Sequence, residues 1–160
     1  MSVSLVLTVL NEGQHIRRLL DSILTQTRKP DQVVVCDGGS SDKTLQIVHE
    51  YTCNLPMQIV QAPGTNISEG RNIAISTAKG DIIAVTDSGV RLDPSWLDHL
   101  VKQFEDENVV LAAGFYVADP ETLFEMAMGA TVLPSVEDVD PKRFLPSSRS
   151  VAFRKNAWEA

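Results

Sequence analysis

Hydrophobic and polar positions along the chain follow two alternating patterns. Continuous apolar runs, typical of strands covered on both faces, predict strands at residues 2–10, 32–37, 57–62, 81–87 and 109–118. Between these runs the apolar positions recur at helical spacing, which predicts helices at residues 11–27, 42–52, 68–80, 93–105 and 120–128. Strands and helices that alternate with short connections predict an α/β fold. We expect a three-layer sandwich with a mainly parallel central sheet, joined by right-handed crossovers.

Local signals mark the ends of several predicted helices. Asp42 or Ser41 can cap the second helix, and Asp93 can cap the fourth, with Pro94 at its first position. Gly80 is placed to end the third helix at a C′-type position. Residues 131–149 contain three prolines and show little periodicity, which predicts a loop near a functional edge.

Length, composition and charge limit the partners and the location that we expect for this chain. The 160 residues suit one domain, and a net charge of −7 argues against a nucleic acid or an anionic membrane as the main partner. A phosphate ligand would therefore need a local group of residues that binds it in spite of the overall negative charge. The chain has no apolar run of transmembrane length and no basic leader, and its two cysteines form no CxxC pair, so we expect a cytoplasmic protein without a zinc site.

Polar residues follow three of the predicted strands where each strand ends. In open α/β sheets these carboxyl ends bind ligands. The residues at these strand ends are Thr8, Leu10, Asn11 and Glu12 on the first strand, Asp37, Gly38 and Gly39 on the second, and Thr86, Asp87, Ser88 and Gly89 on the fourth. An aspartate there can accept hydrogen bonds from a base or a ribose, and glycines let a flat ligand approach the backbone. The alternative is that "DGGSSD" (37–42) is only a turn and a helix cap, but Asp37 and Asp87 together favour a ligand site.

Other nucleotide and catalytic motifs are missing. The sequence has no G-x-G-x-x-G after the first strand, no phosphate-binding G-x-x-x-x-G-K-[ST], no G-x-S-x-G and no H-E-x-x-H. His15, His49 and His99 are scattered over helices, where we interpret them as partly exposed residues rather than ligands or bases.

Four motifs, in order, resemble the family 2 glycosyltransferases, which have the GT-A fold. They are "TVLNE" (8–12), "SILTQT" (22–27) with "DQVVVCDGGSSDKT" (31–44), "GRNIAISTAKGDIIAVTDSG" (70–89) and "DPSWLDHLV" (93–101). Together they extend from residue 3 to about residue 105, and their shared order is much more specific than any one of them.

The resemblance implies a pocket for a nucleotide-sugar donor. Its substrate-binding residues would be Thr8, Leu10, Asn11, Glu12, Asp37, Gly38, Arg71, Asp87, Ser88 and Gly89. Asp37 would contact the base, and Arg71 would reach the nucleotide or its phosphates. Arg71 could instead be an ordinary solvated helix charge.

One motif departs from the family pattern. The family's D-x-D reads Asp87-Ser88-Gly89 here, so the second acid, usually the direct metal ligand, is a glycine. The resemblance implies a Mg²⁺ or Mn²⁺ cofactor held by Asp87, the diphosphate and a later residue. Alternatively a cation such as Arg91 takes over part of that role, unless Arg91 is only a surface charge. Asp93 could replace the missing ligand, but its position before Pro94 favours a helix cap.

The C-terminal residues resemble a part of the family that precedes its acceptor side. "SSRSVAFRKNAWEA" (147–160) is similar to a strand and helix start that the family places before the motif with the general base. We therefore expect residues 1–160 to form a single GT-A-like domain that stops before the acceptor-side region. Asp119 could be an acceptor-side acid or the N-cap of a helix that starts at Pro120, and we name no catalytic base.

The main hypothesis is a glycosyltransferase that moves a sugar from a UDP- or GDP-sugar to a hydroxyl of a sugar, lipid or other acceptor, with inversion. The alternative, motivated by Gly89, is an inactive nucleotide-sugar-binding or interaction module. Sugar nucleotidyltransferases have a glycine-rich loop with an arginine after the first strand. Here only Gly13 follows that strand, so this class of enzyme is disfavoured. A receiver-type signalling domain that uses Asp37 as phosphoacceptor is disfavoured because the first strand lacks an adjacent acidic pair.

Overall fold

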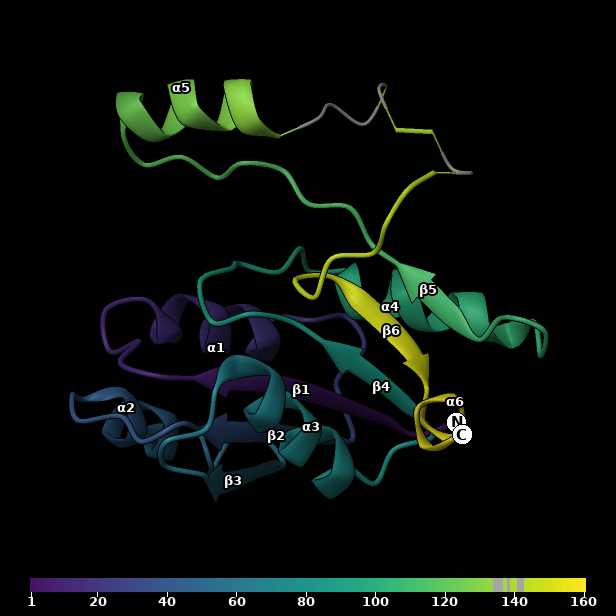
Figure 1. The fold of residues 1–160 in the computed structure, drawn as a ribbon, viewed down its shortest axis with the longest axis horizontal. Coiled ribbons are helices and arrows are strands. Elements are labelled where there is room, and N and C mark those ends of the chain that lie inside the picture. Colours follow the sequence, from purple (N-terminus) through teal and green to yellow (C-terminus); the bar gives the residue numbers. More distant parts are fainter. Residues whose placement is uncertain (134–136, 138, 141–142) are drawn as a thin grey trace.

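A six-stranded sheet forms the centre of the protein in the computed structural model, which describes residues 1–133, 137, 139–140 and 143–160 (Figure 1). The strands are β1 (Val3–Val9), β2 (Gln32–Asp37), β3 (Met57–Gln61), β4 (Ile82–Val85), β5 (Leu111–Ala113) and β6 (Val151–Arg154). They lie in the order β3-β2-β1-β4-β6-β5. The first four strands are parallel, whereas β6 is antiparallel to both β4 and β5. The sheet is thus mainly parallel, as the sequence predicts.

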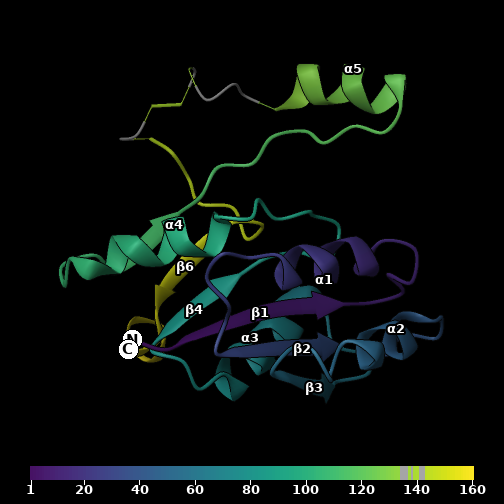
Figure 2. The same cartoon turned by 180° about the vertical axis from the view of Figure 1, so that it is seen from behind.

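Helices cover both faces of this sheet. The helical segments are α1 (Ile16–Leu24), α2 (Thr44–Glu50), α3 (Ile67–Thr77), α4 (Trp96–Lys102), η1 (Gln103–Glu105), α5 (Leu123–Val132) and α6 (Lys155–Glu159). Helices α1 and α4 lie on one face and α3 on the other, as the two opposite views show (Figures 1 and 2). The expected three-layer sandwich is therefore confirmed. None of the described helices combines the length and the apolar character needed to cross a membrane.

The alternation of side chains along β1 feeds two separate hydrophobic cores. Leu5 and Leu7 point to the face covered by α1, where they join Leu19 in one cluster. Val6 points to the other face and joins Ala74 of α3 in the second cluster. Each of these side chains has no exposed surface, and full burial of one such residue stabilises the fold by roughly 1.5–3 kcal/mol. Burial on both faces explains why the central strands read as continuous apolar runs.

The fifth strand is shorter than the pattern predicts. Only Leu111–Ala113 pair with β6, whereas residues 109–118 are apolar enough for a longer strand. At Gly114 the chain still donates its backbone N–H to the carbonyl oxygen of Ser150, at 2.9 Å, and then leaves the sheet. A Cβ on Gly114 would lie 2.0 Å from Ser150 Oγ, so any larger residue would have to displace the Ser150 hydroxyl.

Several predicted helix boundaries are also wrong. Helix α2 follows Lys43 without a side-chain cap, so neither Asp42 nor Ser41 caps it as predicted. The fifth helix covers residues 123–132 instead of 120–128, because Thr122 and Glu125 form a capping box at its start. Helix α3 ends at Thr77, so Gly80 does not end it at a C′ position, and Gly80 has no left-handed backbone. It is needed because an added Cβ would lie 2.5 Å from the backbone nitrogen of Ser4.

Helix α5 stands apart from the sandwich (Figures 1 and 2). None of its residues is buried, and Leu123 and Phe124 are largely exposed. The predicted loop at residues 131–149 overlaps the end of this helix. Residues 134–136, 138 and 141–142 of that loop lie outside the described part of the chain.

Candidate functional site

The loops that follow β1, β2 and β4 meet at one edge of the sheet. These strands are adjacent and parallel, and Val9 at the end of β1 pairs with Asp37 at the end of β2. The residues predicted as a ligand site, apart from Arg71 on α3, therefore share this carboxyl edge. Because β1 lies between β2 and β4, Asp37 and Asp87 flank its end from opposite sides.

The first two loops are locked together by hydrogen bonds. Asn11 adopts a left-handed backbone with φ of 56°, which asparagine tolerates better than most residues. Its side-chain oxygen accepts the N–H of Ser41 at 2.9 Å, and its own N–H donates to Ser40 Oγ at 2.9 Å. The N–H of Glu12 donates to Thr44 Oγ1 at 2.7 Å. Asn11 thus orients the second loop.

Asp37 shapes the loop that follows it. Its side chain is buried, and its carboxylate accepts N–H groups of Gly39 at 3.1 Å and of Ser40 at 3.1 and 3.2 Å. Gly39 has a φ of 104°, a conformation that favours glycine. The turn interpretation of "DGGSSD" is therefore part of the structure. A contact between Asp37 and a base would have to use the remaining lone pairs of a carboxylate that already orders the loop.

A cavity of about 260 Å³ opens at the end of β1. It is lined by five of the predicted site residues, Thr8, Leu10, Glu12, Gly38 and Ser88, and also by Val9, Cys36, Thr65, Asn66, Ile67 and Gly70. The cavity lies between the ends of β1, β2 and β4 and the start of α3. The sequence therefore predicted three of its walls.

The fourth wall, from the β3–α3 turn, was missed. Asn66 caps α3: its side-chain oxygen accepts the N–H groups of Ser68 and Glu69, and the Glu69 carboxylate accepts the Asn66 N–H. This capping box has the N-x-x-E pattern, which is visible in the sequence. That signal could have placed the start of α3, and with it Thr65 and Ile67, at the cavity.

Two arginines meet the carboxylate of Asp87. Arg71 Nη2 donates to Asp87 Oδ1 at 2.8 Å, and Arg149 Nε lies 3.8 Å from Asp87 Oδ2. The side chains of Arg71 and Asp87 are 20% and 26% exposed, so their ion pair is partly buried. Arg71 is thus not an ordinary solvated charge. Arg149 was not predicted, because it is 62 residues from Asp87 and no local pattern marks it.

These residues do not form the metal site that the resemblance implies. Both oxygens of Asp87 face guanidinium groups, and Gly89 offers no side chain. Within the described ranges, no three His, Cys, Asp or Glu side chains are grouped closely enough to hold a metal ion. One carboxylate shared by two cations is a poor ligand set for a divalent cation.

A second charged cluster involves the other candidate cation. Arg91 Nε donates to Asp119 Oδ2 at 2.7 Å, and Arg18 binds the same carboxylate and also Glu121. The hydrogen bond from Arg91 lowers the pKa of Asp119 below its usual range. The N-cap of α5 is Thr122, so Asp119 is not the predicted helix cap.

Asp93 and the three histidines were also interpreted from the sequence. Asp93 accepts the N–H of Ser95 at 2.9 Å and its hydroxyl at 2.7 Å, which closes a turn before α4. The N-cap of α4 is Ser95 and the helix begins at Trp96, so the predicted cap at Asp93 with Pro94 in the first helical position is wrong. The three histidines are all exposed on or beside helices, as expected.

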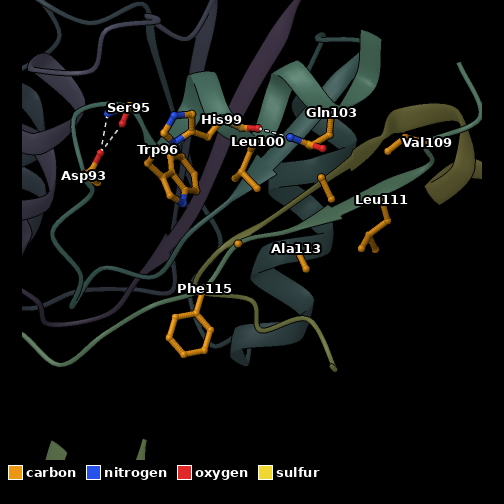
Figure 3. Close-up of a pocket in the computed structure, with 12 residues that line it drawn as sticks. Asp93, Ser95, Trp96, His99, Leu100, Gln103, Val109, Leu111, Ala113 and Phe115 are labelled. Atoms are coloured by element: carbon orange, nitrogen blue, oxygen red, sulfur yellow. Dashed lines mark hydrogen bonds between the residues drawn. The ribbon is translucent and has the colours of Figure 1, made fainter. Parts of the chain in front are cut away.

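A larger hollow of about 710 Å³ lies between α4 and the edge strand β5 (Figure 3). Trp96 and His99 on α4 face Phe115 and Leu111 across it. None of the ten predicted substrate-binding residues lines this hollow. It is therefore separate from the cavity at the end of β1.

The mainly parallel sheet with its polar carboxyl edge has the GT-A fold of nucleotide-diphospho-sugar transferases, as similar solved structures show. S. aureus TarS residues 1–349 have a similar fold, with a TM-score of 0.77 and 21% identity, over 99% of this chain and 48% of that one. Residues 4–157 match the profile of Glycosyl transferase family 2, and the chain belongs to this family.

Individual relatives agree with this assignment. The chain is 34% identical to the chondroitin synthase of Pasteurella multocida over 103 residues, which are 64% of this chain and 11% of the relative. It is 25% identical to the glycosyltransferase GlyA of Streptococcus pneumoniae, over 75% of this chain and 17% of the relative. The chain thus spans less than a fifth of these two relatives.

Similar folds have also been solved with donors bound. TarS 1–349 has been determined with UDP-GlcNAc, and it matches this chain with a TM-score of 0.77 and 21% identity over 99% of this chain and 47% of that one. The mannosyltransferase PcManGT from Pyrobaculum calidifontis has been determined with GDP-Man and Mn²⁺. Its TM-score is 0.76 and its identity 20%, over 98% of this chain and 45% of that one.

Proposed function

We propose that this domain binds a nucleotide-diphospho-sugar at the carboxyl edge and serves as the donor-binding part of a glycosyltransferase. The observation that carries the proposal is the cavity at the end of β1, which five predicted site residues line. The solved structures with UDP-GlcNAc and GDP-Man support the donor class.

The size of the cavity supports a particular pose of the donor. Drug-sized ligands occupy roughly 300–1,000 Å³, so a cavity of about 260 Å³ suits a nucleoside better than a whole nucleotide-sugar. We place the base and ribose there, beside Gly38 and Thr8. The diphosphate and sugar then extend toward Arg71 and Asp87, at the end of β4.

The reaction is a displacement at the anomeric carbon of the sugar. The bond from that carbon to the diphosphate oxygen breaks, and its electron pair stays on the diphosphate. The acceptor hydroxyl oxygen forms the new bond and loses its proton to a general base, which we do not assign to any described residue. Direct displacement by the acceptor inverts the configuration. The chain's own contribution is to hold the donor and to stabilise the charge on the leaving diphosphate.

The acceptor and the cofactor remain predictions. A sugar, lipid or other hydroxyl acceptor fits the family, and Mg²⁺ or Mn²⁺ is implied by resemblance. Because the residues around Asp87 do not fit a metal, we derive no step through one. The cytoplasmic location and the limits of the domain also stay predictions.

Calorimetric titration with UDP and GDP tests the proposal. We expect one of them to bind, and we expect Gly38→Val to weaken it at least tenfold because the new methyl groups would enter the nucleoside cavity. An alanine Cβ at this position would make only ordinary contacts, the nearest at 3.6 Å, so Gly38→Ala should fold and is the smaller companion variant. Thermal unfolding of Gly38→Val checks that the valine variant is folded before its affinity is compared. Ser76→Val on the exposed side of α3 is the control. The proposal fails if neither nucleotide binds, with or without Mn²⁺.

A binding module without transferase activity is the second candidate. Gly89 in the position of a metal-binding acid and the engagement of Asp87 by two arginines favour it. Turnover of a UDP- or GDP-sugar by the protein, detected as released nucleotide diphosphate in the presence of an acceptor, would exclude this second function.

A further inference from the structure

The two charged clusters at the carboxyl edge differ in their ratio of arginines to carboxylates. Arg18 and Arg91 meet two carboxylates, Asp119 and Glu121, so their charges are matched. Arg71 and Arg149 share the single carboxylate of Asp87. In the described part of the chain, this second cluster therefore carries an excess positive charge, within a protein of net charge −7. This cluster is the local positive charge that an anionic ligand would need.

The backbone at Arg149 is held in place by buried groups from three elements. Thr86 Oγ1, at the end of β4, donates to the carbonyl oxygen of Arg149 at 3.1 Å. Trp96 Nε1 on α4 donates to Ser150 Oγ at 2.8 Å, and Gly114 N–H donates to the Ser150 carbonyl oxygen at 2.9 Å. Thr86, Trp96 and Ser150 are all buried. A fixed backbone of this kind directs the Arg149 side chain toward the end of β4.

The Arg149 guanidinium is fixed at one side and accessible at the other. It lies over the ring of Tyr116, at 5.3 Å from the centroid, while its side chain is 51% exposed. At 3.8 Å its contact with Asp87 is longer than a hydrogen bond, so its N–H groups remain available to a ligand. Arg71, by contrast, is hydrogen bonded to Asp87, and its buried Nε has no partner in the described structure.

We propose that Arg71 and Arg149 form a diphosphate clamp that binds the donor diphosphate without a divalent metal. The inference rests on the proposed function and deepens it. Asp87 then holds Arg71 in position, and Arg149 supplies a planar fork of donors suited to phosphate oxygens. The clamp also explains why Gly89 can stand where the family has a metal ligand.

Titrations of UDP, UMP and uridine, each with EDTA and separately with Mn²⁺, test the clamp; GDP, GMP and guanosine serve if the site prefers guanine. We expect the diphosphate to bind in EDTA, more tightly than the nucleoside, with an affinity that falls as salt is raised. Arg149→Gln should weaken diphosphate binding about tenfold or more, since charge-assisted hydrogen bonds are lost, and should leave nucleoside binding unchanged. Arg149→Lys should be intermediate, because lysine keeps the charge without the fork.

Arg28→Gln is the matched control. Arg28 lies before β2, at the opposite edge of the sheet, where it donates to the carbonyl oxygen of Met1. This variant removes the same charge and should bind UDP like the parent. The clamp is overturned, while the proposed function stands, if diphosphate binding requires Mn²⁺ or if Arg149→Gln behaves like Arg28→Gln. If no nucleotide binds in either buffer, the proposed function fails and the clamp fails with it.

Discussion

The sandwich and the segment that follows β5 are built in opposite ways. In the sandwich, β1, β2 and β4 are buried on both faces, and the two cores take their side chains from alternate positions of the same strands. In the segment 115–133, helix α5 has no buried residue, and the ion pairs of Asp119 and Glu121 tie the segment to Arg18 and Arg91. The stability of the fold therefore resides in the sandwich.

The largest effect is expected from truncation of a core side chain. Leu19→Ala should lower the free energy of unfolding by about 2–5 kcal/mol, because a fully buried leucine leaves a cavity. Phe124→Ala on α5, where the ring is 74% exposed, should change it by no more than about 0.5 kcal/mol. Urea unfolding of both variants measures the difference. Equal losses would contradict the comparison.

Ser150, which is hydrogen bonded to Trp96 and to Gly114 where the segment leaves the sandwich, should give the next largest loss of stability. Ser150→Ala removes the acceptor of the Trp96 indole N–H, which is buried, and should cost roughly 1–3 kcal/mol. Thermal unfolding followed by tryptophan fluorescence measures the loss. Arg149→Lys, at the adjacent exposed position, keeps the charge and should leave the unfolding midpoint close to that of the parent.

The two capping boxes offer a matched pair of smaller effects. Asn66→Ala removes the cap of α3, which packs on the sheet, and should lower the stability of the whole domain by about 1 kcal/mol. Thr122→Ala removes the same kind of cap from α5. Because α5 is not packed, this change should reduce local helix content without moving the global unfolding midpoint. Circular dichroism together with chemical denaturation separates the two results.

The smallest effect concerns the ion pairs of Asp119. Arg91 lowers the pKa of this carboxyl in the folded protein, so its stabilising effect is present above the ordinary pKa of an aspartate and is lost as the pH falls through the lowered value. Since Asp119 is 43% exposed, the effect should stay under about 1 kcal/mol. Asp119→Asn should speed hydrogen exchange in residues 115–122 at pH 7.

The pH dependence supplies the control for this last prediction. Below the lowered pKa, the parent carboxyl is protonated and the variant should exchange at the same rate as the parent. Faster exchange of the variant at every pH would mean that the ion pairs do not hold the segment.

The sequence predicted the sandwich well because its signals are local. The apolar runs of β1, β2 and β4 result from burial on both faces, and the helices between them follow from spacing alone. The end of β5 could not be predicted, because the strand stops where Gly114 meets Ser150, 36 residues later. The start of α5 had a local signal in Thr122 and Glu125, but Asp119 before Pro120 imitated a helix cap.

In the candidate site, too, the residues marked by local motifs were predicted, and those that depend on the assembled fold were not. Thr8, Glu12 and Gly38 were predicted because strand ends and motifs mark them, and they line the cavity. Asp37 was predicted as a ligand for the base, and its carboxylate also binds the loop backbone, which an isolated sequence does not reveal. Arg149 reaches Asp87 only through the pairing of β6 with β4, so its role depends on the assembled sheet.

The most direct test of the donor site is a map of where a nucleotide binds. Backbone amide chemical shifts, measured while UDP or GDP is added, should change at Thr8, Gly38, Gly70 and Ser88, around the cavity at the end of β1. Amides of His99 and Leu111, at the hollow between α4 and β5, should stay unchanged. Shifts confined to that hollow, or none at saturating nucleotide, would contradict the account.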